Sequence, residues 1–203
     1  FQRKFNELPC TKNKTFTFGS LNNFRKISDE TVDVWSEILK KVPNSNLILK
    51  SADFCSHETL LNKFKLKNVQ EQIKILNKED FVKKEDHLRV YQSIDLCLDT
   101  FPHNGVTTTF EALWMGVPVI VLKGKNFCSR SGESIIKNTK LYDLISNNEE
   151  DYISKAVNFS RDLDKLKEIR DHLYNSVLST TLFDTKRFAK NLSDTLLEIY
   201  KKN

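Results

Sequence analysis

Two polar segments of the chain combine the residue types that bind phosphate groups. The first, residues 18–26 (FGSLNNFRK), places a glycine, a serine, two asparagines and two cations directly before a helical pattern. The second, residues 99–118 (DTFPHNGVTTTFEALWMGVP), has a glycine shortly followed by three threonines. Backbone N–H groups at the start of a helix are unpaired and lie at the positive end of the helix dipole, so they attract anions. Both segments therefore predict contacts to a phosphate or diphosphate.

Glu111 lies one turn beyond these threonines in the predicted helix. Its carboxylate would face the same crevice and could accept hydrogen bonds from ribose hydroxyls, as the acidic residue of dinucleotide-binding folds does. A purely structural alternative also fits, in which the threonines cap the helix and Glu111 only occupies its first turn. These residues alone leave both alternatives open.

The elements that must position these segments form an alternating pattern of strands and helices. Short apolar runs predict strands at residues 15–18, 46–49, 73–76, 94–98 and 117–122. Helical apolar spacing lies between them, as in the segment that follows a Ser28 cap. The pattern predicts an α/β fold with a doubly wound parallel sheet, whose ligands bind beyond the carboxyl ends of the strands where strand order reverses.

Strand patterns end near residue 148. Three helical segments follow, at 149–161, 163–179 and 184–202, and the last has an apolar stripe. This C-terminal part fits either a simple cover for the core or a helix that also packs on another domain.

Composition excludes several protein classes. The net charge of +5 arises from 32 basic and 27 acidic residues mixed along the chain, which is a weak bias toward anionic ligands and not a nucleic-acid-binding stripe. No apolar run approaches the ~20 residues that a membrane-spanning helix needs. We therefore expect neither a nucleic-acid partner nor a membrane.

The four cysteines are far apart, form no C-x-x-C pair and have no histidine at metal-ligand spacing. This spacing predicts no metal site and indicates a reduced, cytoplasmic compartment.

Residues 104–118 closely resemble the signature of the O-GlcNAc transferase and SPINDLY glycosyltransferases, including their bacterial relatives. Four other segments of that family match in order and spacing. They are residues 18–27, 35–45 and 95–100 and the pair Ser129 and Arg130. The likeness extends from about Phe16 to the C-terminus.

The resemblance implies a Rossmann-like fold that forms the C-terminal, donor-binding half of a GT-B glycosyltransferase, with extra C-terminal helices. The nucleotide-sugar-binding domain would span residues 15–203, and residues 1–14 would end the connection from the preceding half. In such enzymes the N-terminal catalytic half, the acceptor site and the tetratricopeptide repeats lie in other parts of the protein. We therefore expect these 203 residues alone to bind a nucleotide and to transfer nothing.

The resemblance also implies roles for individual residues at the phosphates. Asn23 and Lys26 match positions that contact the donor diphosphate, with Lys26 as the main charge on the leaving nucleotide and thus the expected catalytic residue. Thr107 and Thr108 match residues that hydrogen-bond the same phosphates. Glu111 matches an acidic position that binds the ribose.

A second stretch resembles the part of the family that holds the nucleoside. There Lys84 would reach the ribose, His87 would lie against the base, and the backbone of Val82 would face the base. Val106 stands where some animal members carry a histidine near the sugar, and Arg25 stands where those members have a tyrosine. Because of both departures, the sequence does not determine which sugar the donor carries.

The resemblance implies an inverting transfer from a nucleotide sugar to a protein hydroxyl, without metal or cofactor. The main catalytic demand is then to stabilise negative charge on the departing diphosphate. UDP-GlcNAc is the expected donor, with UDP-glucose and GDP-fucose as alternatives. The alternative function is a non-enzymatic α/β interaction or regulatory module derived from the same fold.

Overall fold

The computed structural model describes residues 3, 7–50, 57–76 and 84–202, and it contains one parallel sheet of six strands. The strand order is β3-β2-β1-β4-β5-β6. The strands are β1 (Phe16–Ser20), β2 (Ser45–Lys50), β3 (Ile73–Leu76), β4 (Leu96–Leu98), β5 (Val119–Leu122) and β6 (Ile145–Ser146). The five predicted strands are confirmed, and the two-residue β6 is the strand that sequence patterns did not indicate.

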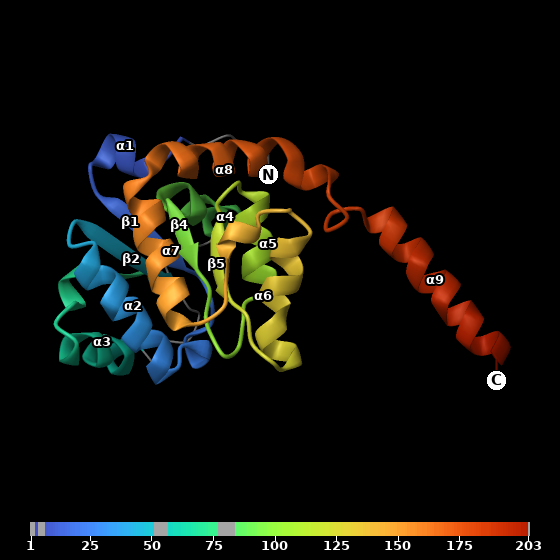
Figure 1. The fold of residues 1–203 in the computed structure, drawn as a ribbon, viewed down its shortest axis with the longest axis horizontal. Coiled ribbons are helices and arrows are strands. Elements are labelled where there is room, and N and C mark those ends of the chain that lie inside the picture. The colour runs from blue at the N-terminus through green and yellow to red at the C-terminus, as the bar shows by residue number, and fades with distance from the viewer. Residues whose placement is uncertain (1–2, 4–6, 51–56, 77–83, 203) are drawn as a thin grey trace.

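Helices cover both faces of this sheet, and the last helix of the described residues projects away from the domain (Figure 1). They are α1 (Pro9–Asn13), α2 (Asp29–Lys41), α3 (His57–Leu66), α4 (Lys84–Val90), α5 (Thr107–Trp114), α6 (Phe127–Lys137), α7 (Glu149–Arg161), α8 (Leu163–Ser176) and α9 (Thr185–Lys202). Helices α2 and α3 contact each other, as do α5 and α6. Because parallel crossovers are right-handed and strand order runs outward in both directions from β1 and β4, these pairs lie on opposite faces. The predicted doubly wound sheet is confirmed.

The sheet and helix α2 show how the core is built. Phe18, Leu47 and Leu96 from three neighbouring strands are completely buried, and so is Trp35 of α2. The predicted cap is confirmed, because the Ser28 side chain accepts a hydrogen bond from the backbone N–H of Thr31 at 3.1 Å. Capping fixes the first turn of α2, and its apolar spacing then places Trp35 on the sheet.

The three C-terminal helices differ in burial. Tyr152 of α7 and Leu166 of α8 are completely buried, so these two helices cover the core. In contrast, α9 has no buried residue and extends away from the domain (Figure 1), with Phe188 67% and Tyr200 81% exposed. The interpretation as simple core cover is right for α7 and α8 and wrong for α9.

The N-terminal segment contacts the sheet. Helix α1 packs against β1, and the backbone N–H of Cys10 donates to Asp95 at 3.0 Å. The division into residues 1–14 and 15–203 stays a prediction. Within the described ranges, no helix is both long and apolar enough to span a membrane.

Candidate functional site

The sheet places the two predicted phosphate segments side by side. Strands β1 and β4 pair directly, with Phe18 opposite Leu96 and Gly19 opposite Cys97. From this pair the strand order runs to β3 on one side and to β6 on the other. The loops that follow β1 and β4 therefore diverge at the reversal of strand order, where open α/β sheets bind their ligands.

Asp99, the first residue after β4, joins these two loops. It is 1% exposed, and its Oδ1 accepts hydrogen bonds from the backbone N–H groups of Thr100 (2.9 Å) and Gly105 (2.7 Å) and from the Asn22 side chain (3.1 Å). Burial raises the pKa of Asp99 to about 7, although these hydrogen bonds and the positive charge of Lys26 act in the opposite direction. Within the described part of the chain, the second oxygen, Oδ2, has no hydrogen-bond partner.

Asn22 extends this connection to helix α5. Its Oδ1 accepts a hydrogen bond from the Thr108 hydroxyl at 2.7 Å. Gly105 makes room for these contacts, because a Cβ there would lie 2.5 Å from Thr108 Oγ1, 2.7 Å from Asn22 Oδ1 and 2.9 Å from Asp99 Oδ1. The Thr108 hydroxyl hydrogen thus points into the protein, and the residue offers its backbone N–H at the helix start.

The start of α5 lacks a side-chain cap. Its N-cap residue is Val106, which is 45% exposed and has no capping side chain. Thr109 instead donates its hydroxyl hydrogen to the carbonyl of Gly105 at 3.2 Å, and Thr107 is exposed. The threonines therefore do not cap the helix, so its first N–H groups remain available to an anion.

Lys26 reaches across from the first loop to the second. It lies in the 3-10 helix η1 (Phe24–Lys26), and its Nζ donates to the backbone carbonyl of Asn104 at 3.0 Å. Asn23, at the start of the same turn, is exposed, and its side chain accepts a hydrogen bond from the N–H of Arg25 at 2.9 Å. The turn thus fixes the backbone from which Lys26 extends.

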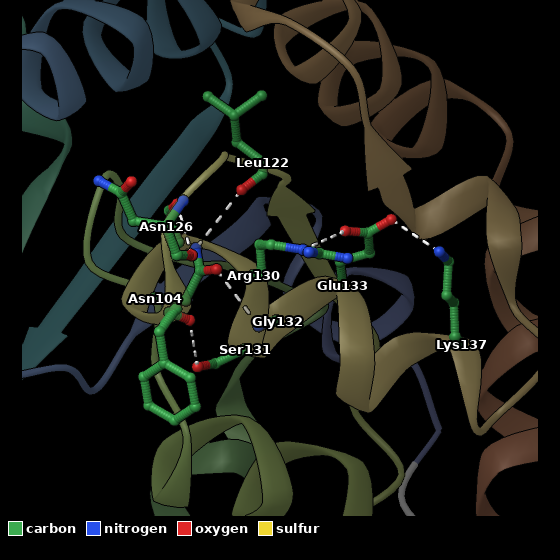
Figure 2. A network of polar contacts seen from close by, with 10 residues as sticks. Asn104, Leu122, Asn126, Arg130, Ser131, Gly132, Glu133 and Lys137 are labelled. Atoms are coloured by element: carbon green, nitrogen blue, oxygen red, sulfur yellow. Dashed lines mark hydrogen bonds and ion pairs between the residues drawn. The ribbon is translucent and has the colours of Figure 1, made fainter.

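Asn104 is completely buried and holds the second loop in place. Figure 2 shows its side chain between the end of β5, at Leu122, and helix α6, at Gly132. Its Nδ2 donates to the carbonyl of Thr100 at 2.9 Å, and its Oδ1 accepts from the N–H of Gly132 at 3.2 Å. Side-chain hydrogen bonds to three other residues therefore hold Asn104, whose backbone carbonyl binds Lys26.

A chain of polar contacts lies further along α5, on the predicted nucleoside side. Glu111 Oε2 accepts from His87 Nε2 at 2.9 Å and from the Tyr91 hydroxyl at 3.3 Å. Lys50, at the end of β2, places Nζ 2.6 Å from His87 Nδ1. An ammonium group only donates, so Nδ1 accepts and Nε2 carries the hydrogen that is donated to Glu111. Burial lowers the pKa of Lys50, and the charge of Glu111 opposes that shift.

The structure connects four of the nine predicted site residues. Lys26, Thr108, Glu111 and His87 belong to one set of contacts, because the Tyr91 hydroxyl that contacts Glu111 also donates to the carbonyl of Thr108 at 3.0 Å. Asn23, Val106 and Thr107 are exposed beside it. Lys84 begins α4, and only the backbone of this residue is described. Val82 lies outside the described residues.

Sequence reasoning missed the residues that position this set. Asp99, Asn104 and Asn22 stood inside the two segments as polar residues after buried strands, which is a signal that could have found them. Lys50 and Tyr91 carried no such signal. Among the described residues, no group of three or more His, Cys, Asp or Glu could hold a metal ion.

Comparisons with known proteins agree with this fold. The family model described as Glycosyl transferase family 41 matches residues 2–192. A probable UDP-N-acetylglucosamine–peptide N-acetylglucosaminyltransferase, SPINDLY of Solanum lycopersicum, is 32% identical over 96% of the chain and 21% of its own length. The UDP-N-acetylglucosamine–peptide N-acetylglucosaminyltransferase of Caenorhabditis elegans is 30% identical over 91% of the chain and 16% of its own length. The chain thus spans about a fifth of the curated relatives it matches.

Solved structures are similar as well. A mutant of the Thermobaculum terrenum O-GlcNAc transferase superposes with a TM-score of 0.85 at 32% identity, over 93% of this chain and 36% of that one. The C-terminal domain of a glycosyl transferase group 1 family protein from Francisella tularensis has the same fold, with a TM-score of 0.64 at 16% identity. The match covers 88% of this chain and 94% of that isolated domain.

Proposed function

Because the chain belongs to glycosyl transferase family 41, we propose that it is the donor-binding half of a glycosyltransferase that uses a nucleoside diphosphate sugar, with UDP-GlcNAc as the donor. The names of the similar plant and nematode proteins support UDP-GlcNAc as the donor and a peptide as the acceptor.

The observation that carries this proposal is the position of Lys26. Its Nζ lies 3.0 Å from the carbonyl of Asn104, directly before the uncapped start of α5. A diphosphate between the two would accept hydrogen bonds from the ammonium group, from the first N–H groups of the helix and from the exposed Thr107 hydroxyl. These donors sit on separate loops that Asp99 holds together, so they are in place before the ligand arrives.

The nucleoside follows along α5. Glu111 would accept hydrogen bonds from the ribose hydroxyls, since His87 and Tyr91 already orient its carboxylate. The His87 ring, fixed by Lys50 on one nitrogen and by Glu111 on the other, offers a face to the base.

In the proposed reaction the bond between the sugar and the diphosphate breaks, and negative charge grows on the departing oxygen. Lys26 and the α5 amides stabilise that charge, which is the largest contribution a preorganised site makes to such a transfer. The acceptor hydroxyl and the groups that activate it belong to the facing half of the enzyme. We propose an inverting transfer that needs no metal, because Lys26 and the helix start supply the positive charge.

Titration calorimetry with UDP and GDP tests the proposal on the 203-residue chain. The Francisella structure is an isolated C-terminal domain of the same fold, and the match covers 94% of it. This supports binding measurements on a single half. We expect UDP to bind better than GDP. We also expect Lys26→Ala to weaken UDP binding ~10- to 100-fold, because a hydrogen bond to a charged group contributes about 1.5–3 kcal/mol.

Lys40→Ala is the matched control. Lys40 is an exposed lysine of α2 that pairs with Glu37, so its replacement should leave UDP affinity unchanged. Absence of UDP binding, or equal binding by wild type and Lys26→Ala, would contradict the proposed site. Equal binding of GDP would contradict the choice of a uridine nucleotide.

A further inference from the structure

The carboxyl group of Asp99 is buried directly beneath the proposed diphosphate site. Its Oδ1 accepts three hydrogen bonds, one from the loop after β1 and two from the loop after β4. Its Oδ2 packs against helix α6, where a Cβ on Gly132 would lie 3.0 Å away, and meets no donor among the described residues. Hydrogen bonding thus stabilises only one of the two oxygens of the charged form.

The charged and titratable groups around Asp99 come from four elements. Lys26 of η1 is the cation that favours the ionised carboxyl. Cys97 of β4, Tyr91 of the 3-10 helix η5 (Tyr91–Ser93) and Tyr152 of α7 also face it, and burial raises the pKa of all three, so they stay neutral near pH 7. The charge on Asp99 near neutral pH therefore depends on Lys26 and on any anion that binds beside it.

A bound diphosphate changes this balance. It places negative charge next to Lys26 and at the N–H groups that follow Gly105. The N–H of Gly105 itself donates to Asp99. Like charges in a buried site disfavour each other's ionised forms, and the attraction of Lys26 is then shared with the ligand. The ionised carboxyl becomes less favourable as the ligand arrives.

We propose that Asp99 is a positioning residue that holds the two phosphate loops together and takes up one proton when the diphosphate binds. The proton goes to Oδ2, so Oδ1 keeps its three hydrogen bonds and the loops stay in place. This inference rests on the proposed donor site.

The pKa of Asp99, which burial raises to about 7, sets the expected pH dependence. The bound form has a higher pKa than the free form. Affinity is therefore highest and constant below the pKa of the free protein, and it falls as pH rises from there to the pKa of the complex. The slope approaches about tenfold per pH unit, the limit for one proton.

Calorimetry with UDP-GlcNAc between pH 6 and 9 tests this coupling, because the two phosphates of a nucleotide sugar do not titrate in that range. Titrations in two buffers of different ionisation enthalpy count the protons taken up. We expect uptake of up to one proton in the wild type and none in Asp99→Asn, whose affinity should be independent of pH. The amide keeps an Oδ1 acceptor and mimics the protonated acid, so Asp99→Asn should bind much better than Asp99→Ala.

His87 belongs to the same site through its contacts with Lys50 and Glu111, so the same measurements on His87→Gln are a control, and the Asp99-dependent slope should persist there. If Asp99→Asn does not fold, the carboxyl ¹³C resonance of Asp99 in the wild type gives a second readout. It should move to the protonated position when UDP-GlcNAc is added near pH 7.5.

The outcomes are distinct. If the wild type binds UDP-GlcNAc but shows no proton uptake, or if Asp99→Asn keeps the wild-type slope, or if the resonance stays at the ionised position, the inference is wrong. If the wild type binds no nucleotide at any pH, the proposed function itself fails and this inference falls with it.

Discussion

At the phosphate end of the proposed site, the buried side chains of Asn22 and Asp99 tie the loops after β1 and β4 together. At the nucleoside end, Lys50, His87 and Glu111 meet through the tips of half-buried side chains. The difference indicates that the phosphate end is rigid before the ligand binds, whereas the nucleoside end depends on side chains that respond separately to substitution. Preorganised charge stabilisation is needed where charge develops in the reaction, and that place is the phosphate end.

The strongest challenge to the phosphate end is Gly105→Ala. The added methyl group would lie 2.5 Å from Thr108 Oγ1 and 2.7 Å from Asn22 Oδ1, so the hydrogen bond between these side chains must break. We expect UDP affinity to fall ~100-fold or more and unfolding free energy to fall by about 1–3 kcal/mol, as overpacked sites do. Calorimetry and thermal unfolding measure both quantities.

Ser134→Ala, at an exposed position of α6, is the control for an alanine on a nearby helix. Full UDP affinity in Gly105→Ala would show that the two loops are not held as tightly as the contacts around Gly105 indicate.

Glu111→Ala separates the two ends. It removes the proposed ribose contact and leaves Lys26 and the helix start intact. We expect UDP affinity to fall by at least ~10-fold, the lower end of the about 1.5–3 kcal/mol of a hydrogen bond to a charged group. Affinity for inorganic pyrophosphate, which has no ribose, should not change, whereas Lys26→Ala should weaken both ligands.

Glu37→Ala removes an exposed acid of α2 and controls for the loss of one negative charge. A parallel loss of pyrophosphate and UDP binding in Glu111→Ala would mean that the two ends are not independent.

The smallest effect is expected at Lys50. Lys50→Met keeps the length of the side chain but removes the donor to His87 Nδ1. We expect a ~2- to 5-fold loss of UDP affinity, in line with the ~0.5–1 kcal/mol of a partly exposed polar pair.

The imidazole ¹⁵N resonances of His87 provide the decisive readout for Lys50. They should report a single tautomer in the wild type and a mixture in Lys50→Met, and Lys50→Arg should restore the single form. An unchanged tautomer in Lys50→Met would show that Glu111 alone orients the ring.

Sequence reasoning was most successful where local chemistry decides the outcome. Five apolar runs predicted five strands, and Ser28 predicted the start of α2. The two segments that are predicted to bind phosphate stood out because glycine, threonine and lysine have local reasons to occur before a helix, and their binding of phosphate stays a prediction.

The remainder depends on contacts between distant parts of the chain. Nothing local shows that Asp99 accepts hydrogen bonds from both loops, or that the Thr108 hydroxyl turns inward to Asn22. Strand β6 was too short to leave a pattern. The apolar stripe of α9 gave the same signal as a buried helix, and only the fold shows that none of the described residues of α9 is buried.

The adjacency of β1 and β4 also bears on how the protein folds. The hydrogen bond between Asn22 and Asp99 closes a loop of 77 residues, which includes β2, β3 and the helices between them. Closing such a loop costs chain entropy before any contact within it compensates, so long-range pairing of this kind forms slowly. The ability to bind phosphate therefore arises from the completed topology, at a late stage of folding, and no local fragment of the chain holds it in advance.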